Sequence, residues 1–129
     1  MDPVLVTQKI IILNDHGKLL AIRRSHTDPD AFAWDLPGGL IEKGEDLKVS
    51  ILREVEEEVA VRVSDLTVLD VFSASSKNNP YFICVGYVAK AADTDVVLSW
   101  EHDQFEWVSK EEFLERTAKE HIKELVRRL

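Results

Sequence analysis

The N-terminal third of the chain alternates apolar runs with polar breaks, a pattern that predicts β-strands. Residues 4–13 are rich in β-branched side chains, and the turn-forming letters NDHG at 14–17 separate them from a second apolar run at 18–24. Two such runs joined by a short turn predict a hairpin. The polar, Pro-containing residues 25–34 predict a loop, and the glycine-dense residues 34–45 are too broken for a regular element.

Three further apolar runs predict strands in the second half of the chain. They lie at 66–72, 81–89 and 104–108, and the polar letters SASSKNNP at 73–80 separate the first two. Strands mixed with helical segments favour an α/β class, in which helices pack on a sheet.

Helices are predicted where a capping residue precedes a segment whose apolar residues repeat about every 3.6 positions. Residues 46–60 contain no Gly or Pro, and Asp46 can serve as their N-cap. Ser109 followed three residues later by Glu112 forms a capping-box pattern that opens another helix. The terminal residues 121–129 predict a third amphipathic segment. Its apolar face comprises Ile122, Leu125, Val126 and Leu129.

The helix predicted at 46–60 carries a carboxylate inside its apolar face. On an ideal helix the stripe expected to pack on the sheet comprises Leu47, Ile51, Leu52, Val55 and Val59. Glu58 falls within this stripe, while Glu54 and Glu57 lie along its margin. A carboxylate directed toward a core costs several kcal/mol unless it is paired or bound to a metal.

Glu54, Glu57 and Glu58 stand at i, i+3 and i+4 and therefore share one helix face. Three carboxylates at such short separation repel one another unless a bound divalent cation offsets their negative charge. An oxygen-only ligand set suits Mg²⁺, or alternatively Mn²⁺. The alternative reading is a solvated helix face on which Arg53 pairs with Glu57.

Composition and charge narrow the function classes. The 129 residues, 45% of them hydrophobic, predict a single domain spanning 1–129. Cys84, the sole cysteine, lies in an apolar run and predicts a buried, inert thiol in a reducing compartment. With neither a secretory-signal pattern nor an apolar run near the roughly 18 residues of a membrane span, a cytoplasmic protein is expected. The net charge of −8 argues against binding nucleic acid polymers.

Residues 39–61, GLIEKGEDLKVSILREVEEEVAV, resemble the Nudix box, G-x5-E-x7-R-E-U-x-E-E-x-G-U, where U is a bulky aliphatic residue. The match includes Gly39, Glu45, the glutamates and Val61, whereas Ala60 stands where the pattern has glycine. We expect Ala60 either to adopt a left-handed cap or to let the helix run on, without loss of a ligand. The resemblance extends to LPGG before the box and EHDQFEWVS after it. It implies the Nudix fold, a mixed sheet sandwiched between helices in an α/β/α arrangement.

The same resemblance implies roles for the box residues. It makes Glu54, Glu57, Glu58 and the carbonyl of Gly38 the metal ligands. Arg53 would orient a glutamate, most simply Glu57, and Glu45 would tie the loop to the helix. Glu101 is the candidate for an extra acidic ligand from a late loop, and Asp103 and Glu106 are the alternatives. Glu101 could also be an ordinary exposed acid of that loop. Either Glu54 or Glu101 would accept a proton from the attacking water.

Candidate substrate contacts lie outside the box. Of the adjacent pair Arg23 and Arg24, only one is expected to reach phosphate, because neighbouring strand residues point to opposite faces. Arg24 is preferred by resemblance to MutT-type members, and a surface ion pair is the alternative. The remaining candidates are core aromatics or base-stacking residues, and polar residues that could read a base or form a turn. They are Phe32, Trp34, Asp35, Asn78, Asn79, Tyr81 and Phe82.

These residues predict hydrolysis of a phosphoanhydride bond in a nucleotide-type small molecule. A MutT-like reaction would convert a nucleoside triphosphate to the monophosphate and pyrophosphate. The alternatives are an ADP-ribose or nucleotide-sugar pyrophosphatase and a non-catalytic nucleotide-binding module. The isomerases that share this fold use a loop cysteine, which the strand position of Cys84 does not supply. The protein would be a monomer or a homodimer.

Overall fold

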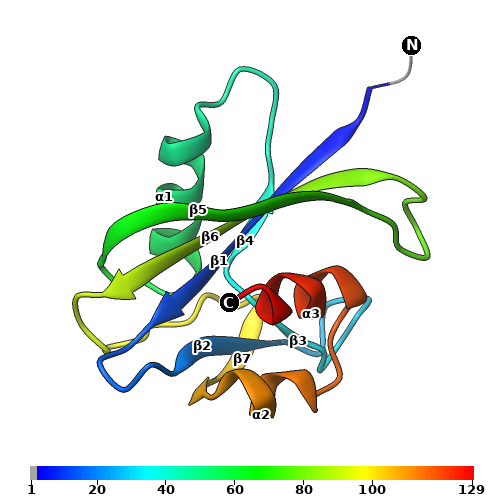
Figure 1. Ribbon diagram of the computed structural model, residues 1–129. Coiled ribbons are helices and arrows are strands. Elements are labelled where there is room, and N and C mark those ends of the chain that lie inside the picture. The colour runs from blue at the N-terminus through cyan, green and yellow to red at the C-terminus, as the bar shows by residue number, and fades with distance from the viewer. Residues whose placement is uncertain (1–2) are drawn as a thin grey trace.

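The computed structural model describes residues 3–129 and shows a mixed β-sheet with helices on both faces (Figure 1). The first two residues of the predicted domain therefore lie outside the described part of the chain. The strands are β1 Leu5–Leu13, β2 Leu19–Arg24, β3 Trp34–Asp35, β4 Gly38–Leu40, β5 Val63–Ala74, β6 Phe82–Ala91 and β7 His102–Val108. The helices are α1 Leu47–Glu58, α2 Lys110–Leu114 and α3 Glu120–Arg127.

Strand β1 is the centre of the sheet. It runs parallel to β6 along its whole length, from Leu5 opposite Phe82 to Leu13 opposite Lys90. On its other side, β1 pairs first with β4 and then, at Leu13, with β2. Strand β2 also pairs with β3 and β7, and β6 pairs with the outer strand β5. The glycines of β4 are thereby held in the sheet, beside the first half of its central strand.

The predicted strands and the hairpin joining the first two are confirmed, although β5, β6 and β7 extend beyond their predicted bounds. The prediction that residues 34–45 contain no regular element is wrong, because β3 and β4 lie there. Strands of two and three residues are too short to show a period of two. They form because β1 and β2 offer backbone N–H and C=O groups that need partners.

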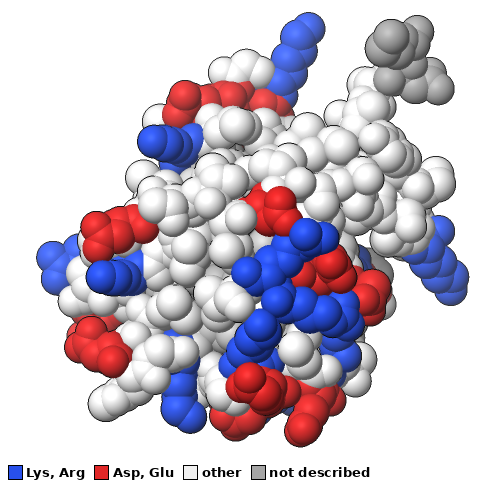
Figure 2. All heavy atoms as spheres, in the orientation of Figure 1, with Lys and Arg blue, Asp and Glu red and all other residues white. Residues whose placement is uncertain are grey.

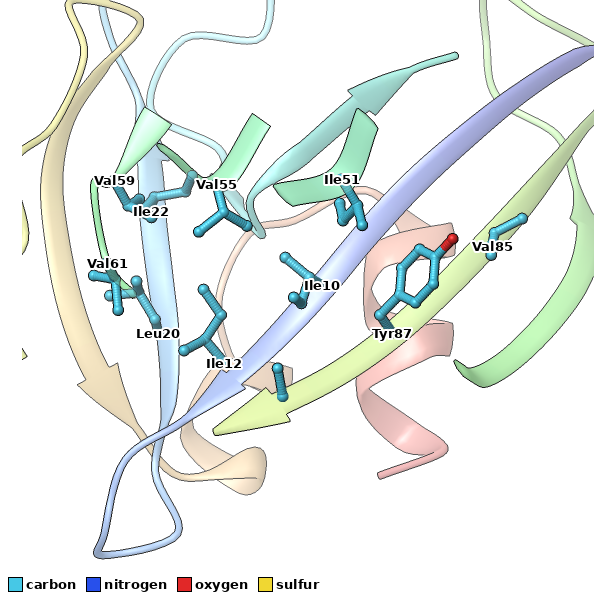
Figure 3. Packing of buried hydrophobic residues seen from close by; sticks show 11 residues of the cluster. Ile10, Ile12, Leu20, Ile22, Ile51, Val55, Val59, Val61, Val85 and Tyr87 are labelled. Atoms are coloured by element: carbon cyan, nitrogen blue, oxygen red, sulfur yellow. The ribbon is translucent and has the colours of Figure 1, made fainter. Parts of the chain in front are cut away.

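Helix α1 covers one face of the sheet, and α2 and α3 cover the other (Figure 1). Ile51 and Val55 of α1, and Val59 just after it, pack against β1, β2 and β6, as Figure 3 shows. Under α2 and α3, the core is formed by Ile11, Leu19, Ala21, Leu36, Val108, Phe113, Ile122, Leu125 and Val126. This arrangement is the predicted α/β/α sandwich.

The apolar stripe of α1 is narrower than predicted. Leu47 and Leu52 remain 45% and 43% exposed, so the prediction that they pack on the sheet is wrong. Residues at the flanks of a helix stripe contact the sheet only where the sheet extends far enough to reach them. Leu129 is likewise 37% exposed, because α3 ends before it.

The helix caps follow the sequence. The Asp46 side chain accepts a hydrogen bond from the Val49 N–H, and Ser109 and Glu112 form a reciprocal capping box. After the end of α1, Ala60 adopts a left-handed backbone with φ of 55° and donates its N–H to the Val55 carbonyl. Of the two expected outcomes at the box glycine position, the left-handed cap is the observed one.

Acidic and basic side chains are interleaved over the face of the molecule in Figure 2. Several pair with each other around α3, including Arg127 with Glu120 and Arg128 with Asp70. None of the helices in residues 3–129 has the length and apolarity that crossing a membrane requires. Cys84 is fully buried in β6, and burial raises the pKa of its thiol to about 11, which leaves it protonated and inert at neutral pH.

Candidate active site

The site begins at the two glycines of β4, which lie against β1. Gly38 has φ of 140°, and a Cβ atom at this position would lie 2.0 Å from the carbonyl oxygen of Gln8. Only glycine permits this conformation and this close approach. A Cβ at Gly39 would meet the Glu54 carboxylate at 3.1 Å. The two glycines thus let the strand backbone and the acidic face of α1 come into contact.

Glu58 is the buried carboxylate that the helix pattern predicted. It is 7% exposed, and one of its oxygens accepts the Gly38 N–H at 3.3 Å. Burial raises the pKa of Glu58 to about 8; the nearby Lys9 opposes the shift, and the charges of Glu54 and Asp35 add to it. Glu58 and Glu54 therefore lie against the same short stretch of backbone, Gly38 and Gly39.

Glu57 is directed away from that contact. It is exposed, and Arg53 donates from one nitrogen to both of its carboxylate oxygens at 3.1 Å. Arg53 also reaches Glu45 at 2.9 Å and Glu54 at 3.6 Å. Glu45 in turn accepts the Glu42 N–H at 2.7 Å, so it links the loop to the helix as the resemblance implied.

The three box glutamates do not converge on one point. Across residues 3–129, no group of three His, Cys, Asp or Glu side chains lies close enough together to hold an ion. The three carboxylates therefore do not form a cluster in this structure, and their role as metal ligands stays a prediction. Like charges on one helix face repel, and here Arg53 draws Glu57 outward while Glu58 turns inward toward Gly38.

A buried ionic group lies beside Glu58, and one of its members, Lys9, was not singled out from the sequence. Lys9 of β1 is 6% exposed, and its ammonium contacts Asp35 at 3.1 Å and the Leu36 carbonyl at 3.3 Å. Arg24 donates to the same Asp35 carboxylate at 2.7 and 3.0 Å and to Asp28 at 2.8 Å. Burial by itself would raise the pKa of Asp35, but Lys9 and Arg24 lower it to about 2. The missed signal is Lys9 as the one charged residue in the predicted strand 4–13.

The two arginines that close β2 have different surroundings. Arg24 lines a small pocket together with Lys9, Asp28, Asp35, Gly38, Glu58, Glu101 and His102. Arg23 instead pairs with Asp103 at 2.9 Å and stacks on the Phe32 ring at 5.2 Å. The structure thus brings Arg24 to the glutamates and leaves Arg23 in a surface ion pair.

Among the candidate late-loop acids, Glu101 lines the pocket that holds Glu58. Its backbone is anchored there because its carbonyl accepts the Ser25 N–H at 2.9 Å. Asp103 is bound to Arg23, and Glu106 is bound to Arg116. Of the three acids, Glu101 is therefore the one placed beside the box glutamates.

A groove of about 520 Å³ runs from this pocket along the sheet face that carries α3. Phe82 and Asn79 line it, and the Phe82 ring meets His121 edge-on at a centroid distance of 4.9 Å. Its other lining residues are Leu5, Thr7, Lys9, Arg24, Gly38, Gly39, Leu40, Ser76, Glu101, Lys119 and His121.

The other aromatic candidates do not line that groove. Trp34 packs on the core beneath α2 and α3 and carries Arg116 over its ring at 4.4 Å. Phe32 and Tyr81 are exposed. Asn79 also closes a turn, in which its side chain accepts the Tyr81 N–H at 3.2 Å. Only part of the predicted substrate set is therefore gathered at the groove: Arg24, Asp35 beneath it, Asn79 and Phe82.

Comparison with known proteins agrees with this geometry. A model of the NUDIX domain matches residues 5–129. A "MutT-like protein" from Streptomyces ambofaciens is 29% identical over 108 residues, which are 84% of this chain and 66% of that protein. An "ADP-ribose pyrophosphatase" from Bacillus subtilis is 29% identical over 66 residues, 51% of this chain and 36% of that protein. The chain thus spans under two thirds of both relatives.

Among solved structures, the crystal structure of the MutT protein from Methanosarcina mazei Go1 has the same fold. It superposes with a TM-score of 0.83 at 29% identity, covering 98% of this chain and 93% of that one. The likeness extends over the sheet and all the helices that frame the groove.

Proposed function

The chain belongs to the Nudix family, and we propose that it is a divalent-metal-dependent pyrophosphohydrolase acting on a nucleotide-like substrate. The observation that carries the proposal is the contact of two carboxylates, Glu54 and Glu58, with the Gly38–Gly39 backbone. This contact lies where the groove and Arg24 meet. The carboxylates that could bind a cation and the Arg24 guanidinium that could donate to phosphate therefore lie close to one another.

The residues fit Mg²⁺ or Mn²⁺. Glu58 is a buried carboxylate with a raised pKa and a long hydrogen bond to the Gly38 N–H, so a cation would stabilise its ionised form. The ligands would be Glu54, Glu58 and the Gly38 carbonyl, with Glu57 joining by a change of rotamer and Glu101 from the late loop. Such an ion would neutralise the charge that develops on the phosphoryl group.

The chain's own side chains would supply the rest of the reaction. Arg24, held by Asp28 and Asp35, would donate hydrogen bonds to the phosphate chain. A water molecule would attack one phosphorus of the α–β anhydride, the bridging P–O bond would break so that nucleoside monophosphate and pyrophosphate separate, and a carboxylate would accept the water proton. Glu101 and Glu54 are the two candidates for this base. Arg53 would position Glu54, which it contacts at 3.6 Å, and link it to the loop acid Glu45.

A nucleoside triphosphate is the proposed substrate, and a nucleoside monophosphate and pyrophosphate are the products. The similarity to a MutT-like protein over 84% of this chain, and to a MutT crystal structure over 98% of it, supports this choice. The groove is large enough for a nucleoside, since small-molecule sites typically occupy about 300–1,000 Å³. ADP-ribose is the second candidate, because a relative carries that name.

The test is a substrate panel with product identification by mass spectrometry. The protein is incubated with Mg²⁺ and canonical or oxidised nucleoside triphosphates, ADP-ribose, nucleotide sugars and dinucleoside polyphosphates. Glu57→Gln is compared with Glu56→Gln, a matched control on the exposed side of α1. We expect turnover of a triphosphate that falls by about a hundredfold or more in Glu57→Gln only.

Two outcomes would contradict the proposal. If ADP-ribose is the best substrate, the triphosphate assignment is wrong and the family chemistry stands. If no compound is turned over with Mg²⁺ or Mn²⁺, yet one raises the melting temperature, the chain is a binding module and the hydrolase proposal fails.

A further inference from the structure

Lys9 lies in the centre of the sheet yet faces the groove. Side chains alternate along a strand, so Leu5, Thr7 and Lys9 of β1 share one face. All three line the groove, and the next residue in that series, Ile11, is core beneath α3. Lys9 is thus the point at which the groove floor meets the core.

The ammonium of Lys9 is held in place without using all of its donors. A lysine ammonium has three N–H donors. In the structure its partners are the Asp35 carboxylate, at 3.1 and 3.2 Å, and the Leu36 carbonyl, at 3.3 Å. Two N–H groups satisfy these two partners, which leaves the third for a ligand in the groove.

The Asp35 carboxylate fixes the positions of two cations at the groove. Asp35 is 3% exposed and is shared between Lys9 and Arg24, so one carboxylate serves two cations. Arg24 is further balanced by Asp28. Within residues 3–129, Asp35 is the one carboxylate in an ion pair with Lys9. The ammonium of Lys9 and the guanidinium of Arg24 are thus held beside each other on one carboxylate, so both can donate hydrogen bonds to neighbouring oxygens of one phosphate chain.

We propose that Lys9 binds the phosphate chain of the substrate directly, next to Arg24, and that Asp35 is the buried counter-ion that holds both cations there. The ligand class is a di- or triphosphate. The inference deepens the proposed function, on which it rests for the identity of the substrate. Lys9 lies outside the Nudix box, and no box residue supplies this cation.

A double-mutant cycle tests whether Lys9 touches phosphate or only neutralises Asp35. Binding of inorganic pyrophosphate is measured by calorimetry in the presence of EDTA. The proteins are the wild type, Lys9→Met, Asp35→Asn and the double variant. Lys90→Met is the control, because it removes the same charge from an exposed pair with Asp65. Circular dichroism confirms that each variant is folded.

If Lys9 contacts phosphate, Lys9→Met weakens pyrophosphate binding by about tenfold or more in the wild-type background, the size of a lost charge-assisted hydrogen bond, and still weakens it in the Asp35→Asn background, where Lys9 is less firmly held. Lys90→Met stays within twofold of the wild type. Should Lys9→Met alone fail to fold, the comparison of Asp35→Asn with the double variant still gives the result, because there the buried carboxylate is neutral.

The proposal is overturned if the effect of Lys9→Met disappears in the Asp35→Asn background, since Lys9 would then act only through Asp35. It is also overturned if the wild type does not bind pyrophosphate at millimolar concentration. The measurement involves no turnover. A chain that hydrolyses nothing but binds pyrophosphate through Lys9 would contradict the proposed function and support this inference.

Discussion

Replacing Ala60 by glycine should stabilise the protein. Ala60 has φ of 55°, in the left-handed region that a Cβ atom disfavours by about 1–2 kcal/mol. Glycine removes that cost, but the unfolded chain gains conformational entropy worth about 0.5–1 kcal/mol. The net expectation is a stabilisation of about 0.5–1 kcal/mol, which for a chain of this size raises Tm by about 2–5 °C.

The assay is urea unfolding followed by circular dichroism, with Ala92→Gly as the matched control. Ala92 is exposed and lies outside the set of positive-φ residues in the described chain, so glycine there should only destabilise, by about 0.5–1 kcal/mol. Equal destabilisation by both substitutions would refute the left-handed cap at Ala60. Turnover by Ala60→Gly should match the wild type, because the residue contributes no side-chain ligand.

Three other predictions follow from the packing and charge of the site. Lys9 and Arg24 lower the pKa of Asp35 from its ordinary value of 3.8 to about 2. Above about pH 4 the ionised carboxylate therefore adds about 2 kcal/mol to the free energy of unfolding, and this contribution is lost as the pH falls from about 4 to 2. Asp35→Asn should remove that part of the pH dependence of urea unfolding. Gly86→Ala should cost about 1–3 kcal/mol, measured in the same way, because its Cβ would lie 2.0 Å from the buried Leu125 side chain. Arg53→Met should change stability by under about 1 kcal/mol, since its ion pairs are largely exposed, yet lower kcat about tenfold or more by releasing Glu54 and Glu45; no change in kcat would exclude a positioning role.

The sequence predicted best the features that depend on local pattern. Helix α1 and its Asp46 cap were predictable because apolar residues repeat at helical spacing over a stretch without Gly or Pro. The inward position of Glu58 follows from helix geometry alone. The α/β/α layering also follows, because amphipathic helices must cover a sheet on the faces that its strands leave apolar.

Features that depend on distant neighbours were not predictable. Strands β3 and β4 exist because β1 and β2 provide their partners, and their two and three residues carry no period. The direction of Glu57 is set by Arg53, so a shared helix face did not mean a shared cluster. The pairing of Lys9 with Asp35 joins residues 26 positions apart, and only the fold brings them together.

The most direct test of the proposed metal site is Mn²⁺ binding, followed by the loss of the free-ion signal in electron paramagnetic resonance. Wild type, Glu58→Gln and Glu56→Gln are titrated under identical conditions without substrate. If Glu58 and the Gly38–Gly39 backbone hold the ion, Glu58→Gln should bind Mn²⁺ about tenfold or more weakly, while Glu56→Gln binds as the wild type does. Equal Mn²⁺ affinity in all three proteins would contradict the account.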